Sequence, residues 1–262
     1  MREELTIIGY LYNGKMLIKD TSPFRKPPLI LLPEQVITLD AIRYSLEICD
    51  ISYSRLKDNL YRFNFSNEKS KPSFPLLYSD VWTIIQHLTL FLKIVKTQFK
   101  ITQDNPIYEP FEGLFEIRNA AQHIDETLTD ILSKNNYSVY GNLSWYAQEK
   151  TDSKKGVITS LYSGSFSNKE EVKASATIPS RNFQDQLIEQ IEFKGIVRPS
   201  HRNGLKKERI LVIDKLMSST EQLIEFFESQ LISQFENHNV KEKHVSDLAV
   251  NLFVDIQYSN EK

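Results

Sequence analysis

Three polar residues in one segment have the types and the spacing to do chemistry. Arg118, Asn119 and His123 lie within residues 111–132, where apolar side chains recur every three or four positions. Those apolar positions are Leu114, Ile117, Ala121, Ile124, Leu128 and Ile131. Such spacing predicts an amphipathic helix, and at about 100° per residue Asn119 and His123 fall opposite its buried stripe. Glu116 lies on the same polar side as a supporting group, and Arg118 lies on the flank.

This set of side chains suits RNA strand scission without a metal. A histidine can act as general base on a 2′-hydroxyl or as general acid on the leaving 5′-oxygen. An arginine can hold the phosphate and offset charge in the transition state, and Arg118 is long enough to reach across the helix. Asn119, four residues before His123, can fix the orientation and tautomer of the imidazole. One histidine serves only one proton transfer, so a second copy from another subunit would complete the site.

The same pattern has a simpler interpretation. A polar stripe opposite an apolar seam is typical of any surface helix, and an arginine, an asparagine and a histidine are ordinary residues there. The alternative is therefore a non-enzymatic binding or assembly protein, with RNA, a nucleotide or a protein as its partner. Both hypotheses stay open on the residues alone. A small-molecule pocket between sheet and helices has no sequence feature in its favour.

The motif also resembles that of a known family. Residues 117–126 read Ile-Arg-Asn-Ala-Ala-Gln-His-Ile-Asp-Glu, and this Arg-Asn-x-x-x-His pattern resembles the signature of the HEPN superfamily (higher eukaryotes and prokaryotes nucleotide-binding). The run is similar to bacterial members whose histidine is followed by x-Asp-Glu-Arg, with Thr127 here in place of that arginine. Residues 140–143, Tyr-Gly-Asn-Leu, resemble the entry into β structure in those proteins.

The resemblance implies a four-helix up-and-down bundle whose motif helices meet across a homodimer to form a composite site. Many members are metal-independent endoribonucleases of phage-defence, toxin–antitoxin or RNA-processing systems, and others are non-catalytic. By this resemblance Arg118 and His123 are the catalytic pair and Asn119 supports them. RNA and a neutralising protein are the implied partners. We expect no metal and no cofactor.

Four long helices are expected to position these residues. Three- and four-residue steps predict helices at residues 34–63, 79–100, 107–134 and 210–236. In the first, a heptad seam contains Cys49, which we interpret as a small core residue. In the second, His87 lies beside the apolar stripe, which indicates a packed or half-exposed histidine. Short polar links between the first three helices favour up-down-up packing.

An insertion at residues 137–209 has β character. Runs rich in β-branched and aromatic residues predict a three-stranded meander over residues 137–148, 157–166 and 172–178. A short helix is then expected from Asn182, an N-cap, to Gly195, which ends it. A basic loop at residues 196–209 is the candidate RNA-contacting patch, with solvated loop side chains as the alternative. Its candidate RNA-binding residues are Arg198, His201, Arg202, Lys206 and Lys207.

Both ends of the chain are expected to add strands to this meander. Asn13-Gly14 between apolar runs predicts a hairpin within residues 1–20, and residues 247–258 resemble a closing strand. An isolated hairpin is marginally stable, so it needs the sheet. The predicted fold class is α+β in a single domain over residues 1–262. Its HEPN-like bundle comes from residues 34–134 and 210–236, and a small antiparallel sheet comes from the insertion and the termini.

Composition excludes several function classes. The 262 residues are 40% hydrophobic and 25% charged with a net charge of −2, as in a soluble globular protein rather than a basic nucleic-acid coat. One cysteine excludes an internal disulfide and a Cys-based zinc site, and a reducing cytoplasm is the simplest compartment. No membrane span or secretory leader is expected, because the apolar runs are too short. P-loop, His-Glu-x-x-His and Gly-x-Ser-x-Gly motifs are absent.

Overall fold

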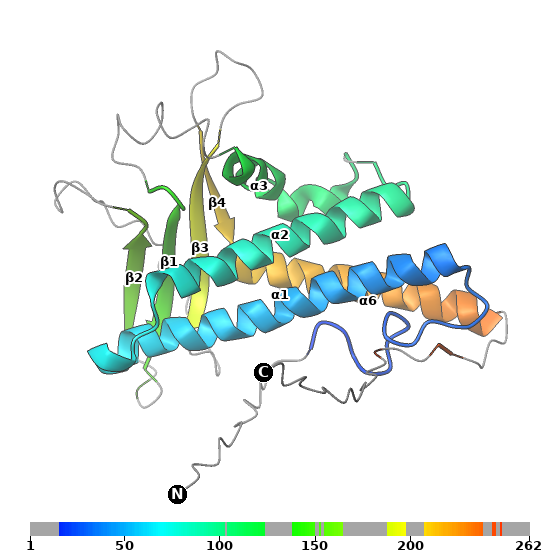
Figure 1. The fold of residues 1–262 in the computed structure, drawn as a ribbon, viewed down its shortest axis with the longest axis horizontal. Helices are drawn as coiled ribbons and strands as arrows, with labels where there is room; N and C mark the ends of the chain where they lie inside the picture. The colour runs from blue at the N-terminus through cyan, green and yellow to red at the C-terminus, as the bar shows by residue number, and fades with distance from the viewer. Residues whose placement is uncertain are drawn as a thin grey trace, which may run out of the picture.

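Long helices and a small sheet make up the fold of this computed structural model. The structure describes residues 16–102, 104–123, 138–149, 152, 155–164, 188–197, 207–237, 243–244 and 247. Helices α1 (Pro33–Phe65), α2 (Phe74–Gln98) and α6 (Ile213–Asn237) are the long ones. The sheet lies at the end of the helix pair where α1 ends and α2 begins (Figure 1). Over the described residues, none of the helices combines the length and apolarity that crossing a membrane requires.

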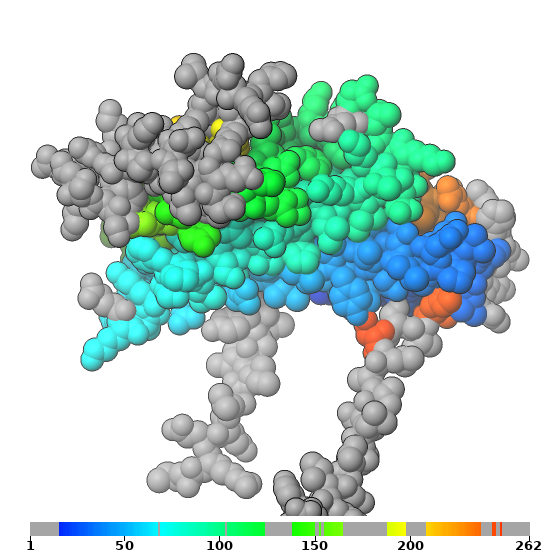
Figure 2. Space-filling view, turned by 45° about the horizontal axis from the view of Figure 1, so that its top comes forward, coloured from blue at the N-terminus to red at the C-terminus, as the bar shows by residue number. Residues whose placement is uncertain are grey.

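Helices α1 and α2 pack against each other along one face of the molecule (Figure 2). The heptad seam of α1 is buried as predicted, and Leu46, Cys49 and Leu56 are fully inaccessible to solvent. Cys49 is a core residue whose Sγ lies 3.7 Å from the carbonyl oxygen of Ile84 on α2. The second helix begins at Phe74, before the predicted start at residue 79, with Ser73 as its N-cap and a proline in its first turn.

The predicted helix over residues 107–134 is wrong in its first turns. Residues Pro106–Phe111 form a 3-10 helix, η2, with Pro110 inside it. Gly113 then adopts φ +86°, and the α-helix proper, α3, spans only Leu114–Gln122. A proline without an N–H and a left-handed glycine prevent one continuous α-helix here. Residues 124–134 of the prediction lie outside the described residues.

The sheet is antiparallel with strand order β2-β1-β3-β4. Its strands are β1 (Asn142–Gln148), β2 (Gly156–Tyr162), β3 (Ile188–Val197) and β4 (Lys207–Val212). The first two confirm the predicted start of the meander. The predicted strand at 172–178 lies outside the described residues.

Other sheet predictions are wrong. The expected short helix ending at Gly195 is strand β3 from residue 188 onward, and its earlier part lies outside the described residues. The expected basic loop gives way to strand at both ends, because β3 runs to Val197 and β4 begins at Lys207. Strand β4 also takes the first residues of the predicted fourth helix, which begins at Ile213.

The predicted terminal strands fail where they can be checked. Residues 16–19 form bends and coil, and Asp247 is not in a strand. Asp247 instead accepts hydrogen bonds from both terminal nitrogens of the buried Arg43, at 2.6 and 2.7 Å. The rest of residues 1–20 and 247–258 lies outside the described residues. The described sheet is therefore built from residues 142–212 alone.

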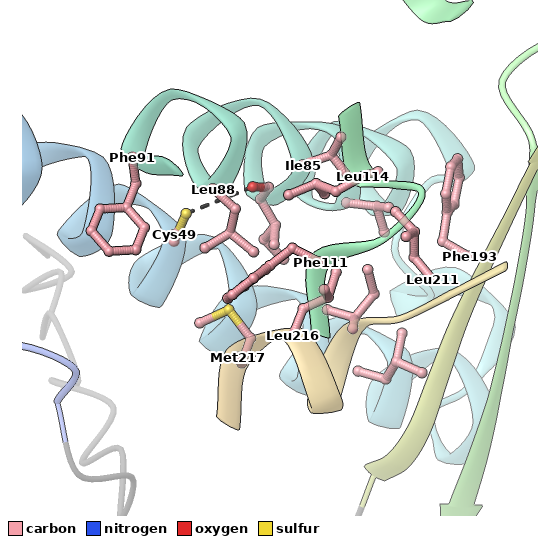
Figure 3. Close-up of a cluster of buried hydrophobic side chains, with 14 of the residues drawn as sticks. Cys49, Ile85, Leu88, Phe91, Phe111, Leu114, Phe193, Leu211, Leu216 and Met217 are labelled. Atoms are coloured by element: carbon pink, nitrogen blue, oxygen red, sulfur yellow. Dashed lines mark hydrogen bonds between the residues drawn. The ribbon is translucent and has the colours of Figure 1, made fainter. Parts of the chain in front are cut away.

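The core lies where the helices and the sheet converge (Figure 3). Leu88 of α2, Phe111 of η2 and Leu114 of α3 meet Leu216 and Met217 of α6 there. All five side chains are buried, so these elements share one hydrophobic core. The described residues thus form one α+β unit in which α3 is held by its neighbours rather than by its own length.

We predict that Gly141→Ala destabilises the protein by about 2–4 kcal/mol. Gly141 has φ +88°, and an added Cβ would lie 2.6 Å from Cζ of Phe193 and 2.8 Å from the carbonyl oxygen of Lys194. Gly164→Ala is the matched control, because its φ of +121° is also left-handed but its Cβ would be 3.9 Å from the nearest atom. Urea unfolding measures both. Equal losses in the two variants would contradict the steric argument.

Candidate functional site

Helix α3, which carries the motif, is fixed by contacts at its base. Leu114 and Ile117 are buried, which confirms these positions of the predicted apolar stripe. Ile117 packs on Gly195 of β3, where an added Cβ would lie only 3.3 Å from its Cγ1. A glycine in the strand therefore lets the helix approach the sheet closely. Arg118, the next residue, projects from a helix whose position is set by this contact.

Glu116 holds α3 to the neighbouring strand. Its carboxylate accepts hydrogen bonds from Nε and Nη2 of Arg209 on β4, the second at 3.0 Å. Glu112 accepts a third, from Nη1, at 3.4 Å. Glu116 therefore forms an ion pair that joins α3 to β4, and its supporting role in catalysis stays a prediction. These carboxylates also raise the pKa of Arg209 above its usual value, chiefly through the hydrogen bond with Glu116.

A cleft between α2 and α3 contains the arginine of the motif. We call it the α2–α3 cleft; it has a volume of about 430 Å³. It is lined by Trp82, Gln86, His87 and Leu90 of α2 and by Arg118, Ala121 and Gln122 of α3. Helical spacing explains both walls, since residues three or four apart share a face. The volume lies within the range of small-ligand pockets.

The electrostatics of the α2–α3 cleft favour an anion. Arg118 is the charged residue among its lining, and its Nη1 donates a hydrogen bond to Oε1 of Gln122 one turn later. The Trp82 ring packs against Phe193 of β3 in a T-shaped arrangement, with ring centroids 5.1 Å apart and an interplanar angle of 78°. A guanidinium beside an aromatic ring and amide groups can bind a phosphate and its neighbouring base.

Asn119 and His123 lie on the exposed side of α3 and do not line the cleft. His123 follows the last helical residue, with φ −112° and ψ 33°. Helix α3 therefore ends one residue before His123, and the predicted pairing of Asn119 with His123 on one helical face falls at the helix terminus. Both side chains stay on the same short segment as Arg118, within five residues of it.

Other candidate residues are placed only in part. Arg198, His201, Arg202 and Lys206 lie outside the described residues, and Lys207 is the first residue of β4. Among the described residues, no group of three or more His, Cys, Asp and Glu side chains could hold a metal ion.

His87 is a titratable residue of the α2–α3 cleft that the sequence did not single out as functional. Its imidazole is half-buried, as expected, and burial lowers its pKa below the usual 6.5. Its Nδ1 is shielded from water and hydrogen-bonds to no described residue. The available sequence signal was weak: His87 is beside the apolar stripe of α2, but nothing in the sequence shows that α3 lies across from it.

A separate titratable cluster lies where β3 meets α1 and α6. Asp214, in the first turn of α6, accepts hydrogen bonds from the Tyr53 hydroxyl and the Ile191 N–H, both at 2.6 Å. The buried Glu189 lies near this carboxylate, and burial followed by repulsion from Asp214 raises the pKa of Glu189 to about 7. Lys57 opposes the shift. This cluster joins β3 to α1 and α6, and it lowers the stability of the folded protein when Glu189 is charged.

The chain was compared with models of protein families, with curated proteins and with solved structures, and none matches. The HEPN resemblance therefore rests on the motif at residues 117–126 and the helical pattern around it. The α2–α3 cleft and the side chains of α3 are therefore the structural features that bear on function.

We predict a coupling free energy of about 0.5–1 kcal/mol between Arg209 and Glu116 at low salt. A double-mutant cycle with Arg209→Met and Glu116→Gln, measured by urea unfolding, gives this value. It should shrink in 1 M salt, because Glu116 is 46% exposed and the pair is screened. The matched cycle with Glu112→Gln should give almost no coupling, since Glu112 is 76% exposed. Equal coupling in the two cycles would contradict the assigned geometry.

We predict that Glu189→Gln stabilises the protein at pH 8 by on the order of 1–3 kcal/mol. A raised pKa in the folded state means that folding disfavours the charged carboxylate. The cost of Glu189 is absent below about pH 4.5, grows as the pH rises and is complete above its folded pKa of about 7. The free energy of unfolding, measured from pH 4.5 to 8, should therefore fall less steeply in the variant. The exposed Glu109→Gln is the control, and an equal change there would refute the prediction.

Proposed function

We propose that this protein is a metal-independent endoribonuclease of HEPN type. One observation carries the proposal: Arg118 lines a cleft of about 430 Å³ together with Trp82 and His87. RNA offers the matching groups, because a phosphate can bind to Arg118 and a base can stack on Trp82, which we call the aromatic wall. The net charge of −2 is compatible with this, because the positive charge is needed only at the cleft.

The proposed reaction is an internal phosphoryl transfer. The 2′-oxygen of the RNA attacks the adjacent phosphorus and loses its proton to a base as the P–O5′ bond breaks. The 5′-oxygen leaves with a proton from an acid, which gives a 2′,3′-cyclic phosphate and a 5′-hydroxyl. Arg118 binds the non-bridging oxygens and offsets their growing charge. His123 supplies one of the two proton transfers, and Asn119 supports it.

A homodimer is part of the proposal. Asn119 and His123 lie on the exposed side of α3, which leaves this side accessible to RNA or to a second copy of the chain. The competing hypothesis is a non-catalytic binding protein on the same scaffold. In that case Arg118 and the aromatic wall would bind RNA, or another phosphate ligand, without cleaving it.

Purified protein should cleave single-stranded RNA in the presence of a chelator, and Arg118→Ala and His123→Ala should each lower the rate at least 10²-fold. Labelled RNA of mixed sequence, separated on denaturing gels, measures the rate and shows the cyclic phosphate end. Arg62→Ala and His244→Gln are matched controls of the same residue types outside the cleft and should cleave normally.

The two hypotheses give different results in the same assay. RNA binding without cleavage, measured by fluorescence anisotropy and lost in Arg118→Ala, would support the binding protein. Neither binding nor cleavage, or cleavage that survives both substitutions, would refute the proposed site.

A further inference from the structure

We propose that His87 is a second catalytic residue, the general base that takes the proton from the 2′-hydroxyl. This inference rests on the proposed ribonuclease function. It assigns the second proton transfer to a histidine of the same chain rather than to a second copy of His123. The two imidazoles then have separate roles, with His87 as base and His123 as acid.

The placement of His87 carries the inference. It lines the same cleft as Arg118, from the facing helix α2. A phosphate held by Arg118 would therefore present its neighbouring ribose to the α2 wall. His87 lines this wall together with Trp82 and Leu90. Among the described lining residues of the α2–α3 cleft, His87 is the side chain that can change protonation near neutral pH.

The burial of the ring determines which nitrogen can react. Nδ1 of His87 is shielded from water and hydrogen-bonds to no described residue. The half-buried ring can therefore exchange a proton with a ligand only through Nε2. Burial also lowers the pKa of His87, so the ring is neutral at neutral pH and its Nε2 lone pair can accept a proton.

The assignment balances the reaction. His87 removes the 2′-hydroxyl proton while the 2′-oxygen bonds to phosphorus. His123, in its protonated form, donates to the 5′-oxygen as the P–O5′ bond breaks. After the cycle His87 carries one proton more and His123 one fewer, and exchange with water restores both. His123 is exposed, so its exchange with water is direct.

The roles can be separated with RNA in which sulfur replaces the bridging 5′-oxygen at the scissile bond. A thiolate leaves without a proton, because the pKa of a thiol is about 8.5, far below that of an alcohol. Cleavage of the sulfur substrate therefore needs the base but not the acid. The full-length wild type, His87→Gln and His123→Gln are compared on the oxygen and the sulfur substrates, with kcat and KM measured for each.

We expect His87→Gln to lower kcat about 10²-fold or more on both substrates, with KM little changed. His123→Gln should be slow on the oxygen substrate and close to wild type on the sulfur substrate. His244→Gln, a half-buried histidine outside the cleft, should match wild type on both. Circular dichroism melting of His87→Gln checks that the fold is retained, and His87→Phe, a second variant that lacks a basic nitrogen, should lose kcat to the same extent.

Each other result would overturn the inference in a recognisable way. Normal cleavage by His87→Gln would exclude His87 from catalysis, and a change confined to KM would make it a binding residue. Rescue of His87→Gln by the sulfur substrate would make it the acid. A His87→Phe variant that folds and keeps the wild-type kcat would reduce the role of this side chain to packing. An inactive wild type on both substrates would refute the proposed function itself.

Discussion

The contact between Ile117 and Gly195 is the constraint on which the candidate site depends. Helix α3 is only nine residues long and would be marginal by itself. It is stable here because Leu114 and Ile117 are buried and because a glycine in β3 lets Ile117 reach the strand. Once Ile117 faces the sheet, helical geometry directs Arg118 and Gln122 toward α2 and leaves Asn119 exposed.

The sheet contributes to both walls of the α2–α3 cleft, although none of its residues lines the cavity. Strand β3 supports the α2 wall through the Phe193–Trp82 contact and the α3 wall through Gly195. Strand β4 holds the first turn of α3 through the Arg209–Glu116 ion pair. The ring contact and the glycine packing are insensitive to salt, whereas the ion pair is exposed enough to be screened. The cleft should therefore keep its shape over a wide range of ionic strength.

The long helices could be predicted from the sequence because their apolar period repeats many times. The buried seam of α1 runs from Leu39 to Leu60, over about six turns, so a misread residue hardly changes the interpretation. Strand β3 could not be predicted this way. Ile188 and Ile191 are three apart, which suits a helix, and Gly195 suggested a helix end, whereas its real role is to admit Ile117. Short apolar runs fit both periods, and only tertiary contact decides between them.

Strand β4 was misread for a related reason. Ile210 and Ile213 are also three apart and join smoothly to the pattern of α6, although the chain changes from strand to helix between residues 212 and 213. Arg118, Asn119 and His123 could be predicted together because they are close in sequence, and of these three Arg118 lines the cleft. His87 could not be predicted with them, because it is more than thirty residues from Arg118 and joins it only through the packing of α2 on α3.

The different surroundings of His87 and His123 make a division of labour physically reasonable. Burial costs stability for an imidazole whose Nδ1 has no described partner, and packing alone would favour an apolar side chain at that position. The same burial disfavours the charged form of the ring and leaves Nε2 as the nitrogen that could accept a proton, as the proposed base requires. His123 is exposed at the end of α3 and can regain a proton from water after each turnover, as an acid requires. Two like groups in unlike environments can thus serve opposite proton transfers in one reaction.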